Sequence, residues 1–111
     1  MLQRTIHELR RAARSHHAAV WHSVAERLER SRHQVDPLNV GELERLAKAD
    51  ETLVVPGKLL AAGSIAKPVT VAAFSYSEAA RAKIHAAGGK ALTISELLRA
   101  DPKGRGVRIV A

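Results

Sequence analysis

The stretch NVGELERLAKADETLVVPGKLLAAGSIAKPVTVAAF, residues 39–74, decides the fold of this chain. Asn39 can cap a helix, with Glu42 completing a capping-box spacing, and the apolar side chains that follow at helical spacing are Val40, Leu43, Leu46 and Ala47. The β-branched run Thr52 to Val55 predicts a buried strand that ends at Pro56, because proline cannot donate to a sheet ladder. A second strand, Val69 to Phe74, is apolar at nearly every position, which indicates burial on both faces.

Two lysines lie between these strands. Lys58 follows the Pro56-Gly57 turn, and Lys67 follows a glycine loop and precedes Pro68. We therefore expect both side chains on loops at strand ends, where binding groups commonly lie.

The flanking segments extend this pattern to a single domain of 111 residues. Before the central stretch, apolar periodicity predicts helices over about 5–15 and 18–30, with Trp21 on or beside the core-facing stripe. After it, Ser77 and the Thr93/Glu96 pair can cap helices over 78–87 and 94–100, and short strands are expected at 91–92 and 107–110. The prediction is an α/β fold: a basic helical N-terminal arm, residues 1–36, and a core, residues 37–111, with a small mixed sheet and packed helices.

The formal net charge is +7, from 18 lysines and arginines against 11 acidic residues. Such an excess points to a polyanionic partner, with nucleic acid first and an anionic membrane surface as the alternative. A basic protein without a particular ligand also remains open. The chain has one Phe, one Tyr and one Trp, so stacking on aromatic platforms is not the expected way of holding nucleic acid.

Several other functional classes find little support. The absence of cysteine excludes disulfides, thiolate zinc sites and thiol catalysis, and no histidine pair has the HExxH spacing of a metal site. Ser64 and Lys67 match S-x-x-K without the other elements of that enzyme class, and no phosphate-binding loop is present. No apolar run is long enough to cross a bilayer or resembles a signal peptide, so we expect a cytoplasmic protein. Because the catalytic and metal-binding motifs are missing, we expect that it is not an enzyme and carries no cofactor or metal.

Three basic groups are candidate phosphate contacts, because guanidinium forks match phosphate oxygens in pairs. The first lies on the first helix and consists of Arg4, Arg10, Arg11 and Arg14. The second lies at the end of the second helix and the connection after it, and consists of Arg27, Arg30, Arg32 and His33. The third is the glycine turn with Lys103, Arg105 and Arg108. In each case the alternative is a solvated face, a plain linker or an exposed turn.

The run ETLVVPGKLLAAGSIAKPVTVAAFSYSEAARAKI, preceded by LNVGELERLAKAD and VWHSVAERLERSR, resembles the L18e family of archaeal and eukaryotic large-subunit ribosomal proteins. The similarity runs from about Leu9 to the C-terminus, and Glu42 stands where the family is expected to carry a basic residue. The resemblance implies a fold related to the bacterial L15 family and a structural role on the ribosome. Its implied partners are large-subunit ribosomal RNA and neighbouring ribosomal proteins, with no membrane and no small-molecule substrate.

The resemblance adds Lys58 and Lys67 to the expected RNA contacts. The alternative from another class is a small basic DNA-binding or architectural protein, against which the lack of a helix-turn-helix pattern argues.

Overall fold

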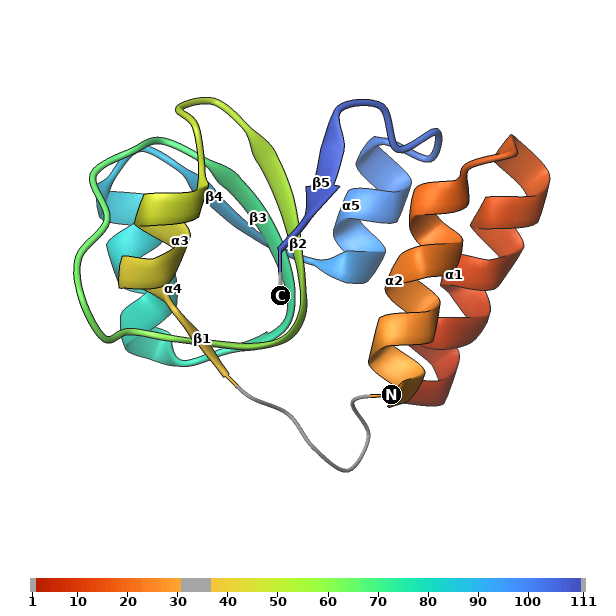
Figure 1. Ribbon diagram of the computed structural model, residues 1–111, viewed down its shortest axis with the longest axis horizontal. Coiled ribbons are helices and arrows are strands. Elements are labelled where there is room, and N and C mark those ends of the chain that lie inside the picture. Colours follow the sequence, from red (N-terminus) through yellow and green to blue (C-terminus); the bar gives the residue numbers. More distant parts are fainter. Residues whose placement is uncertain (1, 31–36, 111) are drawn as a thin grey trace.

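The computed structural model describes residues 2–30 and 37–110. Helices and strands alternate along most of this chain (Figure 1). In order they are α1 (Leu2–His16), α2 (Ala19–Arg30), β1 (Leu38–Asn39), α3 (Val40–Leu46), β2 (Thr52–Leu60), β3 (Thr70–Tyr76), α4 (Glu78–Ala86), β4 (Lys90–Thr93), α5 (Ile94–Ala100) and β5 (Val107–Ile109). The predicted α/β class is confirmed.

The sheet has the strand order β1-β2-β3-β4, and β5 also pairs with β2. The strand β1 pairs at Leu59 and Leu60 while β5 pairs at residues 52–54, so the two short strands share one edge of β2 at opposite ends. All four pairings are parallel, and the expectation of a mixed sheet was therefore wrong. Parallel pairing requires long connections: α3 connects β1 to β2, α4 connects β3 to β4, and the segment 61–69 connects β2 to β3 without a helix, while α5 leads from β4 to β5 on the far side of β2.

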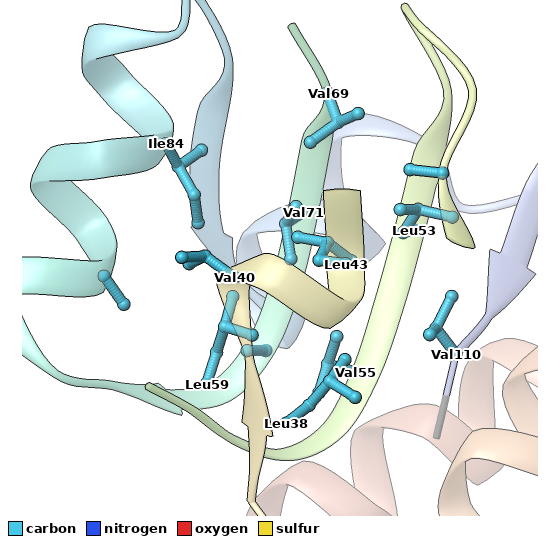
Figure 2. Packing of buried hydrophobic residues seen from close by; sticks show 13 residues of the cluster. Leu38, Val40, Leu43, Leu53, Val55, Leu59, Val69, Val71, Ile84 and Val110 are labelled. Carbon is cyan, nitrogen blue, oxygen red and sulfur yellow. The ribbon is translucent and has the colours of Figure 1, made fainter. Parts of the chain in front are cut away.

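Helices cover both faces of the sheet (Figure 1). The helices α3 and α4 lie over one face, and α1, α2 and α5 lie on the other. Strand residues alternate between the two resulting cores: Leu53 and Val55 of β2 belong to the α3/α4 core, and Val54 belongs to the other. Figure 2 shows Leu43, Val55, Val71 and their neighbours meeting in the first of these cores. The prediction that the strand over 69–74 is buried on both faces is confirmed, because Val71 and Ala73 belong to the first core and Ala72 to the second.

The N-terminal helices, expected as a basic arm, form a hairpin that packs on the second face of the sheet. Leu9 of α1 and Trp21 of α2 are fully buried in the core that also contains Val54 and Leu97. The indole Nε1 of Trp21 donates a hydrogen bond of 2.8 Å to the carbonyl oxygen of Pro102. The hairpin is thereby joined to the C-terminal part of the chain.

Three local expectations were wrong. The strand β2 does not stop at Pro56 but continues to Leu60, with a register irregularity between Val55 and Lys58. This irregularity accommodates a residue that has no N–H to donate. Lys58 consequently lies within a strand, opposite Ser75 of β3, instead of on a turn. Leu46, expected on the inward face of α3, is the last residue of that helix and is 47% exposed.

Candidate nucleic-acid interface

The arginines of α1 divide into two kinds. Ile6 and Leu9 are buried in the core on one side of α1. Arg4, Arg11 and Arg14 are exposed on the rest of the helix surface. Arg10 is half-buried and forms an ion pair with Glu29 of α2. Three of the four predicted residues therefore present their guanidinium groups to solvent, and the fourth links the helical hairpin.

A groove separates α1 from α5. It consists of two hollows, of about 280 Å³ and about 500 Å³, both of which are lined by Glu8 of α1 and by Ser95 and Arg99 of α5. Arg11 contributes to the smaller hollow and Arg4 to the larger one. The groove thus gathers three guanidinium groups and one carboxylate.

Arg99 is the functional candidate that sequence reasoning missed. It is exposed in the last turn of α5, where a basic residue is ordinary because it complements the helix dipole. Only the packing of α5 against α1 brings it beside Arg4 and Arg11. No local pattern around residue 99 carries that information.

The C-terminal turn also lies against the helical hairpin. Gly104 has φ +66°, and its α-carbon hydrogen points at Val20 and Trp21 so closely that a Cβ there would stand 2.5 Å from Val20 Cγ1. Lys103 and Arg105, on either side of this glycine, are exposed. The turn therefore presents two cations beside the start of α2, and phosphate contact there stays a prediction.

Lys67 is engaged in the fold. Its Nζ donates hydrogen bonds to the carbonyl oxygens of Glu44 and Ala47, at 2.8 and 2.9 Å. These carbonyls lie at the C-terminal end of α3, where no intrahelical donor remains for them. The Glu44 carboxylate in turn accepts the backbone N–H groups of Ala66 and Lys67. The lysine fixes its loop to the helix.

Arg108 is engaged in a similar way. Its Nε and Nη2 donate to the two carboxylate oxygens of Glu51, at 2.7 and 2.9 Å, and Nη2 also donates to the carbonyl oxygen of Leu46 at 2.6 Å. The hydrogen bond with Glu51 raises the pKa of Arg108, and the same bond lowers the pKa of the Glu51 carboxyl. A phosphate could engage Arg108 fully only by displacing this carboxylate, so RNA contact at Lys67 and Arg108 stays a prediction that competes with internal hydrogen bonds.

The other candidates lie apart from the groove. Lys58 is exposed on β2, and Arg27 and Arg30 are exposed on α2. Arg32 and His33 lie outside the described residues. Within residues 2–30 and 37–110, no three histidine or acidic side chains come together as a possible metal site. In the same ranges no helix combines the length and the hydrophobicity needed to span a bilayer.

Comparison with known proteins identifies the family. The model of the protein family described as ribosomal protein 60S L18 and 50S L18e matches residues 2–111. The chain belongs to the L18e family. The resemblance inferred from the sequence is thereby confirmed. The L18e proteins are structural ribosomal proteins, and their archaeal members are named as proteins of the large subunit.

Three archaeal relatives, each named large ribosomal subunit protein eL18, illustrate the similarity of this L18e chain. The Methanopyrus kandleri protein is 47% identical, over 98% of this chain and 90% of its own length. The Archaeoglobus fulgidus protein is 53% identical, over 84% of this chain and 80% of its own. The Pyrobaculum aerophilum protein is 51% identical, over 92% of this chain and 84% of its own.

Proposed function

We propose that this L18e-family protein is a structural constituent of the large ribosomal subunit and binds large-subunit ribosomal RNA. The observation that carries the proposal is the gathering of Arg4, Arg11 and Arg99 along the α1–α5 groove. Neither the Arg4 nor the Arg11 side chain has a hydrogen bond or ion pair with another described residue, so each guanidinium group can bind phosphate without loss of an internal contact. Neighbouring ribosomal proteins and a cytoplasmic location follow from the same assignment.

The mechanism is electrostatic positioning. Guanidinium forks bind phosphate oxygens in pairs, and each contact releases condensed counterions from the RNA. Such contacts orient the protein on the RNA without reading its sequence, so recognition depends mainly on the shape of the RNA surface. The protein contributes a rigid scaffold, because α1 and α5 are both fixed to the sheet through the buried residues Leu9 and Leu97.

The first test is sedimentation of cell extract on a sucrose gradient at moderate and at high salt. We expect the protein to migrate with the large subunit at moderate salt and to be released only at high salt. Protein that stays at the top of the gradient at moderate salt would overturn the ribosomal assignment.

Filter binding of the purified protein to an archaeal large-subunit rRNA transcript tests the groove itself. Arg11→Gln and Arg99→Gln should each weaken binding. Each should also make the negative slope of log affinity against log salt shallower by about one, as expected for one lost phosphate contact. Arg45→Gln is the matched control, since Arg45 is exposed on α3 at the opposite face of the sheet. Equal effects of all three substitutions would refute a localised interface. Tighter binding to duplex DNA than to the transcript would favour the DNA-binding alternative.

A further inference from the structure

The larger hollow of the groove differs in chemistry from a plain phosphate site. It lies between α1, the start of α5 and the carboxyl ends of β3 and β4, where Phe74, Ser75 and Thr93 are found. Its volume of about 500 Å³ is in the range of pockets that hold small organic ligands. Ligand pockets in parallel sheets are commonly found at the carboxyl ends of the strands.

We propose that this hollow holds one nucleotide of the bound RNA, with its base turned out of the helical stack. The inference rests on the proposed rRNA binding and specifies which part of the RNA the larger hollow binds. Single-stranded bulges and loops supply such bases, and proteins recognise them by stacking and by hydrogen bonds to base edges.

The lining offers a partner for each part of a nucleotide. Phe74, half-buried beside Ile94, gives an apolar aromatic surface for the base. The hydroxyl groups of Ser75 and Ser95 can bond the ribose or the base edge. Arg4 and Arg99 supply the positive charge for phosphate groups.

Glu8 decides between a nucleotide and a bare phosphate. Glu8 is half-buried and lines both hollows, and its carboxylate has no hydrogen bond with another described residue. A carboxylate repels phosphate but accepts hydrogen bonds from the exocyclic amine of a base or from a ribose 2′-hydroxyl. The pairing of one acceptor with two guanidinium groups therefore fits a whole nucleotide better than a phosphate alone.

A steric block tests the proposal. Ser95 is the second residue of α5, and a tyrosine substituted there would fill the hollow. Ala79 is exposed at the second position of α4, on the other face of the sheet, so Ala79→Tyr is a control with the same helix position. In filter binding to the rRNA transcript, Ser95→Tyr should bind about tenfold more weakly than wild type, the change expected for one lost stacked base. Ala79→Tyr should bind as wild type does. Wild-type affinity of a folded Ser95→Tyr protein would overturn the inference.

Glu8→Leu provides an independent arm if Ser95→Tyr does not fold. Loss of the acceptor should weaken binding if a base or ribose occupies the hollow. If only phosphate lies there, removal of the negative charge should strengthen binding and would overturn the inference.

Ultraviolet crosslinking of the wild-type complex, followed by mass spectrometry, gives a direct readout. A nucleotide adduct on the peptide that contains Phe74 is expected. Adducts found only on other peptides would contradict the inference. Wild-type protein that fails to bind the transcript at all would refute the proposed function instead, so the two failures are distinguishable.

Discussion

The substitution Gly104→Ala is expected to destabilise the fold strongly for a change of one methyl group. Gly104 has φ +66°, a region in which an L-residue costs about 1–2 kcal/mol. An added Cβ would also stand 2.5 Å from Val20 Cγ1 and 3.2 and 3.3 Å from two ring carbons of Trp21. Carbon atoms prefer a separation of about 3.5–4.0 Å, so these groups must move.

The neighbours have little room to do so. Trp21 is fully buried and is held by its hydrogen bond to Pro102, two residues before the glycine. Overpacking of this kind costs about 1–3 kcal/mol. Together with the backbone term, the loss in free energy of unfolding should be about 2–5 kcal/mol.

Gly106→Ala separates the two terms. Gly106 has φ +71°, but an added Cβ would meet no atom within 4 Å. It should therefore lose only the backbone term of about 1–2 kcal/mol. Urea denaturation followed by the fluorescence of Trp21, the single tryptophan, measures both variants. Equal losses for Gly104→Ala and Gly106→Ala would refute the packing of the turn against α2.

Three further predictions follow from the polar contacts. Lys67→Met should lower the free energy of unfolding by about 1–2 kcal/mol, since two helix-end carbonyls lose their donor. Lys58→Met should change the free energy of unfolding by less than about 0.5 kcal/mol and should weaken rRNA binding instead. Urea denaturation and filter binding measure both variants, and similar stability for the two would contradict the capping role of Lys67. Burial raises the pKa of Tyr76, the only tyrosine, to about 12, so its contribution to stability is complete below pH ~10 and is lost as the pH rises towards the folded-state value; absorbance of the tyrosinate should show this late ionisation, and ionisation near pH ~10 in folded protein would disprove the burial. The lowered pKa of Glu51 means that its carboxylate stabilises the fold at pH values above the unfolded-state pKa, and this contribution is lost as the pH falls through the folded-state value. Glu51→Gln should therefore flatten the acid limb of the profile of stability against pH, measured by urea denaturation. An unchanged limb would contradict the role of Arg108.

Local chemistry made part of the fold predictable from sequence. The caps at Ser77 and Thr93 use side-chain oxygens and backbone N–H groups three residues apart, and both are present, at 3.1 Å to Ala80 and Glu96. The buried strands were predictable because their apolar content does not depend on which neighbours they have. Strand direction and the length of β2 were not, since the continuation past Pro56 depends on pairing with β1 and β3 at Lys58 and Leu59.

The candidate site was less predictable for the same reason. Arg10, Lys67 and Arg108 are cations of the same types as the other candidates. Their partners lie 19 residues away for Arg10, 20 and 23 for Lys67, and 57 and 62 for Arg108. Sequence cannot show which cations have such partners. Nor could it bring Arg99 to the groove, because the contact between α1 and α5 joins elements from opposite ends of the chain.

The division of the cations between two sides of the molecule bears on the proposed RNA binding. On the side of α3, Lys67 and Lys83 direct their amino groups at backbone carbonyls, and those of Ala61 and Gly63 accept from Lys83 at 2.7 Å. These two amino groups stabilise the loop over residues 61–67 and are therefore less available to bind an anionic partner. On the side of α1 and α5, the arginines line an open groove whose walls are fixed to the sheet. Binding from the α1–α5 side would therefore require no side-chain hydrogen bond of Arg4 or Arg11 to break, which favours that face for the proposed RNA contact.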